Sequence, residues 1–136
     1  MQVVLDTNVL VSGLISAKAT PARIIDLLRA GKLSLVVDDR IFAEYFDVLR
    51  RPQLQRYFDQ SAVAHILDYV RSSSEKVIVV RFITGLPDRQ DAPFLEVACQ
   101  AEVPLITGNA RHFPAESRCG ARISSPAEFI SSAEWL

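Results

Sequence analysis

Short apolar runs recur along this chain, and longer stretches with helical spacing of apolar residues separate them. The continuous runs at residues 3–5, 33–37, 77–80 and 104–107 are typical of strands that a parallel sheet buries on both faces. A shorter run at residues 122–123 predicts an edge strand. The pattern therefore predicts strands that alternate with helices.

Helix-start signals precede several of the intervening segments. Thr20 is expected to cap one helix, Asp38 the next, and Ser125 the last, which is expected to carry Trp135. Pro52 is expected to interrupt the helix that follows Asp38. Further helical patterns occupy residues 9–15, 53–58, 61–73 and 94–101.

The alternation predicts one α/β domain over residues 1–136, with a mainly parallel sheet of four or five strands. Neither an internal repeat nor a low-complexity linker divides the chain. Hydrophobic residues make up 49% of it and charged residues 23%, which excludes a disordered chain. At 136 residues the chain is long enough to form its own core without disulfide bonds.

The charge is nearly balanced, because 15 Lys and Arg residues accompany 16 Asp and Glu residues for a net charge of -1. Any contact with nucleic acid must therefore be a local basic patch. Cys99 and Cys119 lack metal-ligand spacing and are expected to be thiols of a reducing compartment. We expect a cytoplasmic protein that does not enter membranes, because no leader pattern or long apolar run is present.

Acidic and amide side chains follow each of the four main predicted strands. Loops at the carboxyl ends of parallel strands open on one edge of the sheet, where ligands bind in open α/β folds. Four segments thus bring oxygen atoms to that edge, through Asp6, Asp38, Asp39, Glu44, Asp88, Asp91 and Asn109.

Carboxylates that meet in a cleft repel one another unless a cation neutralises them. An all-oxygen cluster suits Mg²⁺ or Mn²⁺ rather than zinc, because no thiolate or imidazole grouping has ligand spacing. Such a site polarises a phosphoryl oxygen and activates a water molecule. Phosphodiester hydrolysis is the reaction class that this site fits best.

The same acids have a structural interpretation that the residues alone leave open. Asp6 could cap the helix that follows it, and Asp88 and Asp91 could cap the helix that contains Phe94. Asp38 and Asp39 are more typical of caps than of ligands. Glu44 is the more informative acid, because it borders the apolar face of its helix instead of facing solvent.

Four stretches form an ordered set of motifs: Leu5-Asp6-Thr7-Asn8-Val9, Phe42-Ala43-Glu44, residues 86–95 and Thr107-Gly108-Asn109. This set resembles the PIN domain family, and more narrowly the small bacterial PIN proteins described as toxins of toxin–antitoxin pairs. The resemblance spans the whole length of the chain. The set is specific, although each piece alone is weak.

This resemblance implies a Rossmann-like three-layer fold and a metal-dependent endoribonuclease that hydrolyses RNA phosphodiester bonds with Mg²⁺ or Mn²⁺. By position, Asp6, Glu44 and Asp91 match the three main acids of the family, and Asp88 is a neighbouring acid. Thr107 matches a hydroxyl position near the metal. RNA, an antitoxin protein and a second copy of the chain are the implied partners.

Asn109 departs from the family pattern, in which an acid commonly follows the glycine of the fourth strand. An amide oxygen can still bind a metal or position a water, but it adds no charge. A second cation would be held more weakly, so a weak or inactive module that only binds RNA is the alternative. Gln90 also stands where relatives often have an acid. We expect Asn8, Thr107 and Asn109 to support the site.

Arg89, Arg111 and His112 are the basic residues nearest to the predicted site in sequence, and we expect them to contact RNA. A haloacid dehalogenase type of phosphatase would also place an aspartate at the end of the first strand. That chemistry needs a second acid two residues later, where Asn8 stands and cannot donate a proton.

Overall fold

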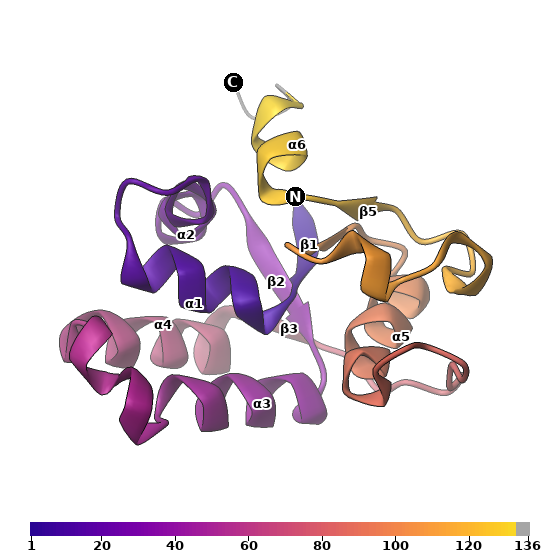
Figure 1. Cartoon of the computed structure of the whole chain (residues 1–136), viewed down its shortest axis with the longest axis horizontal. Helices are drawn as coiled ribbons and strands as arrows, with labels where there is room; N and C mark the ends of the chain where they lie inside the picture. Colours follow the sequence, from indigo (N-terminus) through magenta and orange to yellow (C-terminus); the bar gives the residue numbers. More distant parts are fainter. Residues whose placement is uncertain (133–136) are drawn as a thin grey trace.

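The computed structural model describes residues 1–132, and in this part of the chain five strands form one parallel sheet (Figure 1). The strands lie in the order β3-β2-β1-β4-β5, so β1 is central. This arrangement confirms the predicted α/β class with a parallel sheet. The strands are β1 Gln2–Leu5, β2 Ser34–Val37, β3 Glu75–Lys76, β4 Leu105–Ile106 and β5 Ile123–Ser124.

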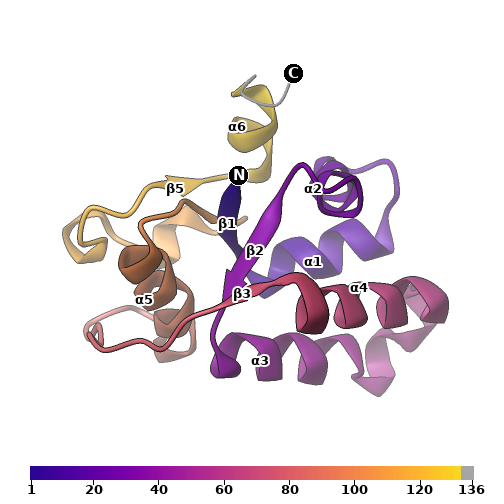
Figure 2. The same ribbon diagram turned by 180° about the vertical axis from the view of Figure 1, so that it is seen from behind.

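Helices cover both faces of the sheet and make a three-layer fold. In Figure 1 and in the reverse view of Figure 2, the first four helices lie on one side of the sheet and α5 on the other. The helices are α1 Thr7–Ile15, α2 Thr20–Arg29, α3 Asp39–Leu49, α4 Gln60–Ser73, α5 Ala92–Ala101 and α6 Pro126–Ser131. Short 3-10 turns are η1 Pro52–Tyr57, η2 Arg89–Asp91, η3 Ala110–His112 and η4 Ala115–Ser117. No helix among residues 1–132 is long and apolar enough to cross a membrane.

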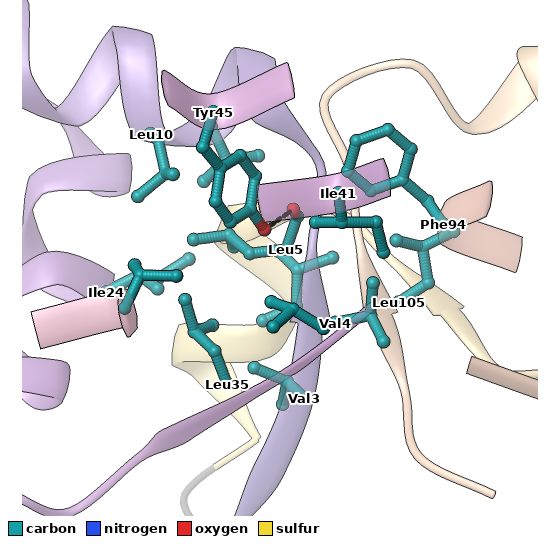
Figure 3. Close-up of a cluster of buried hydrophobic side chains, with 14 of the residues drawn as sticks. Val3, Val4, Leu5, Leu10, Ile24, Leu35, Ile41, Tyr45, Phe94 and Leu105 are labelled. Atoms are coloured by element: carbon teal, nitrogen blue, oxygen red, sulfur yellow. Dashed lines mark hydrogen bonds between the residues drawn. The ribbon is translucent and has the colours of Figure 1, made fainter. Parts of the chain in front are cut away.

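The core is built around β1, whose residues Val3, Val4 and Leu5 are completely buried. They pack with residues from the helices and from the neighbouring strands (Figure 3). Tyr45 of α3 is also fully buried, and its hydroxyl donates a hydrogen bond to the backbone carbonyl of Leu5. This bond ties α3 to the end of the central strand and satisfies a polar group that would be costly to bury alone.

The predicted strand at residues 77–80 is wrong, because β3 consists of Glu75 and Lys76. The Val77 amide still donates to the Val37 carbonyl at 3.0 Å, but β2 ends there and offers no further strand. Side chains of α5 bind the next backbone groups instead. Gln100 pairs with the Ile78 carbonyl and accepts from the Val80 amide at 2.9 Å. Ile78 and Val80 are 84% and 75% exposed, so this apolar run is not a buried strand.

Most helix starts agree with the sequence patterns. The Asp38 side chain accepts a hydrogen bond from the Ile41 amide at 3.0 Å, and the capping box of Ser125 and Glu128 is present. Thr20 is a correction, because it is the first helical residue and Ala19 occupies the cap position. Trp135 lies outside the described residues.

Candidate metal-binding active site

Asp6 and Thr107 meet where the strand order reverses, between the carboxyl ends of β1 and β4. The chain builds the sheet outward from β1 through β2 to β3 and then crosses to β4 on the other side of β1. Loops diverge at such a point and leave room for a ligand. The Thr107 hydroxyl donates a 2.7 Å hydrogen bond to Asp6 Oδ2 and accepts one from the Asn109 amide at 3.1 Å. Strand pairing thus orients the Asp6 carboxylate.

Asp6 is buried, with an exposed fraction of 6%. It stands at the cap position of α1, and its carboxylate accepts a hydrogen bond from the Thr107 hydroxyl instead of forming a regular cap hydrogen bond. Burial raises the pKa of Asp6, while the hydrogen bond from Thr107 and the nearby amides of Asn8 and Thr7 lower it in part. A carboxylate kept in a buried place without a capping role is typical of a functional group.

Glu44 lies on α3 and reaches the same region. Its carboxylate accepts a hydrogen bond from the hydroxyl of Thr7, the residue directly after Asp6. The neighbouring Tyr45 holds this part of α3 against Leu5, which explains why Glu44 approaches the end of β1. Burial raises the pKa of Glu44; the Thr7 hydrogen bond opposes this, and the charge of Asp6 adds to it.

Asp91 approaches from the third segment, at the start of α5. It occupies the cap position, but its side chain makes no cap hydrogen bond; it lies 3.1 Å from Nδ1 of His112 instead. The pKa of Asp91 is raised to about 6, mainly by burial and then by the charges of Asp6 and Asp88, while His112 opposes this shift. The charge of Asp6 therefore raises the pKa of both Glu44 and Asp91, which come from two other elements.

Asp88 has a different position from the other three acids. It is exposed, and its carboxylate accepts a 2.9 Å hydrogen bond from the Gln90 amide, so it caps the η2 turn. Its charge nevertheless raises the pKa of Glu44 and of Asp91. Asp88 can therefore contribute charge at the edge of the acid cluster while it holds the loop before α5.

Asp38 belongs to a structural network instead. Besides its cap, it forms a 2.7 Å ion pair with Arg40, whose other guanidinium nitrogen lies 2.7 Å from buried Glu96 of α5. Glu96 also accepts from the Ile83 amide at 2.6 Å. The network joins α3, α5 and the segment after β3, and it explains how the charge of Glu96 is tolerated in the interior.

The predicted supporting and basic residues lie around this cluster. Asn8 and Asn109 line a cavity of about 280 Å³ beside Gly108, and Asn8 Oδ1 is a buried oxygen without a hydrogen-bond partner in the described residues. Arg89 and Arg111 are exposed and belong to η2 and η3, the turns that carry Asp91 and His112. His112, predicted to contact RNA, contacts Asp91.

The chemistry of these donors fits a divalent cation of the Mg²⁺ or Mn²⁺ type. The carboxylates of Asp6, Glu44 and Asp91 have raised pKa values, and none forms an ion pair with Lys or Arg in the described part of the chain. Within residues 1–132, however, no three Asp, Glu, His or Cys side chains are gathered closely enough to form a complete ligand group. Cation binding would therefore require these side chains to move together.

Sequence reasoning missed the contacts that orient these acids. The hydrogen bond between Thr7 and Glu44 was not predicted, because the two residues are far apart in the sequence. Tyr45 had the spacing of an ordinary core residue. Glu96 lies in an apolar helical pattern, where a single acid is a detectable signal of a buried ion pair.

Several protein families combine an α/β domain with acidic residues at the point where the strand order reverses. Comparison with known proteins shows which of these families the chain belongs to. A family model described as PIN domain matches residues 2–111, and the chain belongs to the PIN domain family. Members of this family are typically nucleases, and they typically bind divalent metals.

Among curated proteins, the chain is similar to the uncharacterized protein MJ1680 of Methanocaldococcus jannaschii. The two are 28% identical over 110 residues, which are 80% of this chain and 71% of the archaeal protein. No solved structure is significantly similar to the chain.

Asp91→Asn is expected to stabilise the metal-free protein. The pKa of Asp91 is raised in the folded state, so folding favours its protonated form; stability is lost as the pH rises from about 3.8 to about 6. Above this window the variant should gain about 1 kcal/mol in free energy of unfolding, or about 4 °C in Tm. Thermal unfolding with a chelator should show this gain at pH 8 and a smaller one at pH 5. An equal or lower Tm at pH 8 would contradict a raised pKa of Asp91 in the folded state.

Proposed function

We propose that this protein is a Mg²⁺- or Mn²⁺-dependent endoribonuclease and the toxin of a toxin–antitoxin pair. The observation that carries the nuclease proposal is the convergence of Asp6, Glu44 and Asp91 from three elements, with each pKa raised and no Lys or Arg ion pair in the described residues. The toxin role rests on the resemblance of the motifs to those of small bacterial PIN proteins. It implies an antitoxin protein as partner and a homodimer as assembly.

Asp6, Glu44, Asp91 and Asp88 are the residues that would hold the cation. Bound there, a divalent cation supplies charge to polarise a phosphoryl oxygen and lowers the pKa of a water molecule. The chain's own hydroxyl and imidazole groups orient the carboxylates: Thr107 holds Asp6, Thr7 holds Glu44, and His112 holds Asp91. These contacts orient each acid on its own element, and a bound cation would draw the carboxylates closer together.

Glu44 is the carboxylate to which we assign the proton of the attacking water. It is half-buried and its pKa is raised, so it is more basic than an ordinary glutamate. Asp6 is more deeply buried and is bound by Thr107, which suits a fixed anchoring role. Arg89 and Arg111 are exposed cations near this region and would contact the phosphates of an RNA strand.

A second function is favoured by Asn109. This residue follows the glycine after β4, and its backbone amide serves the structure by donating to Thr107. Its amide side chain brings no charge to a cation, so the acid cluster has less negative charge than a full set of four main acids would provide. A module that binds RNA and does not cleave it is therefore the alternative function.

Asp6→Asn is expected to abolish RNA cleavage. The change keeps the size of the side chain and a hydrogen-bond acceptor for Thr107 but removes the charge at the buried end of β1. We expect cleavage of labelled single-stranded RNA with Mn²⁺ to fall at least about 100-fold, as for the loss of a main electrostatic group. Asp26→Asn, which changes an exposed acid on α2, is the matched control and should cleave normally. Equal activity of both variants would assign the cleavage to a contaminating nuclease.

Asn109→Asp is expected to increase metal-dependent cleavage, because it adds a charge beside the cluster without removing the backbone contact to Thr107. The gain should be largest with Mg²⁺ at low concentration, and Asp6→Asn in the same background should remove it. RNA retention by the wild-type chain without cleavage at any Mn²⁺ concentration, together with cleavage by Asn109→Asp, would favour the binding module over the nuclease.

A further inference from the structure

Two cysteines far apart in sequence meet beside α5. Cys99 lies near the end of α5, and Cys119 lies in the loop that leads to β5. Both side chains line the same two neighbouring cavities, each of about 310 Å³. The Cys99 thiol donates a 3.2 Å hydrogen bond to the Arg118 carbonyl, which belongs to the peptide bond that joins Arg118 to Cys119.

The backbone around Cys119 forms an unusual turn. Cys119 has a φ of 51° and Gly120 a φ of 83°, so two consecutive residues are left-handed. Glycine adopts this conformation readily, whereas a side chain with a Cβ atom pays for it. The turn presents Cys119 at the surface, while Cys99 is half-buried. Both residues line the same two cavities, and the Cys99 thiol bonds the carbonyl directly before Cys119, so the two side chains lie side by side, as a disulfide bond between them requires.

We propose that Cys99 and Cys119 are a modification site that forms an intramolecular disulfide bond on reaction with a small-molecule disulfide. Exposed Cys119 attacks first as its thiolate: its sulfur bonds to one sulfur of the small molecule, and the other sulfur leaves as a thiol after taking up a proton. Cys99 then loses its proton to solvent and attacks the Cys119 sulfur, which releases the second small thiol. Two protein thiols are oxidised, and the small disulfide is reduced to two thiols.

This order of attack follows from the positions of the two thiols. Burial, and then the neighbouring Cys119 thiol, raise the pKa of Cys99, so Cys99 is the poorer nucleophile toward a reagent in solvent. Once Cys119 carries a mixed disulfide, Cys99 is already beside the sulfur that it must reach. Proximity then favours closure within the chain over a link between two copies.

The bond would fasten a loop that also supports the candidate active site. Arg118 is next to Cys119. Its Nε donates a 2.6 Å hydrogen bond to the Phe113 carbonyl, and its Nη2 donates a longer one of 3.5 Å to the Ala110 carbonyl. These two carbonyls flank His112, the partner of Asp91. Oxidation therefore attaches α5 to the segment that holds His112, without changing a side chain that contacts the acids.

The test treats the full-length chain with glutathione disulfide and measures its intact mass, its free thiols and its Tm. The wild type should lose two hydrogen atoms, retain no thiol that reacts with maleimide, and gain roughly 5–10 °C in Tm, which dithiothreitol reverses. Cys99→Ser should stop at a glutathione adduct on Cys119 and show no such gain. Cys119→Ser should react far more slowly, because its remaining thiol is half-buried.

Three results would overturn the proposal. The wild type could keep both thiols, it could stop at a stable glutathione adduct on Cys119, or it could form a dimer linked through Cys119 on a non-reducing gel. Comparison of the two serine variants in their reduced forms separates a folding defect from a loss of the bond, because both should unfold near the Tm of the reduced wild type.

Discussion

The hydrogen bond from Thr107 to Asp6 is the contact on which the candidate site depends. It joins the residues that directly follow β1 and β4, the two strands between which the chain reverses its direction across the sheet. Val4 and Leu5 pair with Leu105 and Ile106, so strand register brings the two side chains together. Asp6 is consequently a carboxylate held in the interior by the sheet itself, and its burial raises its pKa.

Packing around β1 then brings the other acids to this fixed point. The hydrogen bond of Tyr45 to the Leu5 carbonyl places α3 against the end of β1, and Glu44 is the residue directly before Tyr45 on that helix. The ring of Tyr45 packs against Phe94 of α5, with centroids 6.4 Å apart, near the end of α5 that carries Asp91. One aromatic side chain thus links the three elements that supply the acids. The packing that stabilises the fold therefore also brings the negative charge of Asp6 near Glu44 and Asp91, and a bound cation would relieve this repulsion.

The sheet was predictable because buried parallel strands have a simple apolar pattern, as in Val3 to Leu5. Residues 77–80 have the same pattern, but β2 ends before they could pair, and side chains of α5 bind their backbone instead. Side-chain hydrogen bonds of this kind depend on residues that are distant in sequence, so the local sequence of residues 77–80 does not reveal them. The same reason hides the partners of the acids. The spacing of Asp6 and Asp91 predicts both a helix cap and a ligand, and only the structure shows that their carboxylates contact Thr107 and His112.

The most direct test of the central claim is Mn²⁺ binding measured by electron paramagnetic resonance, because it examines the acids without any substrate. We expect the wild type and Asp26→Asn to bind Mn²⁺ with equal affinity, Asp91→Asn to bind it at least about 10-fold more weakly, and Asp6→Asn to bind it least. Mn²⁺ binding by Asp6→Asn with the affinity of the wild type would contradict a cation site built on the buried end of β1.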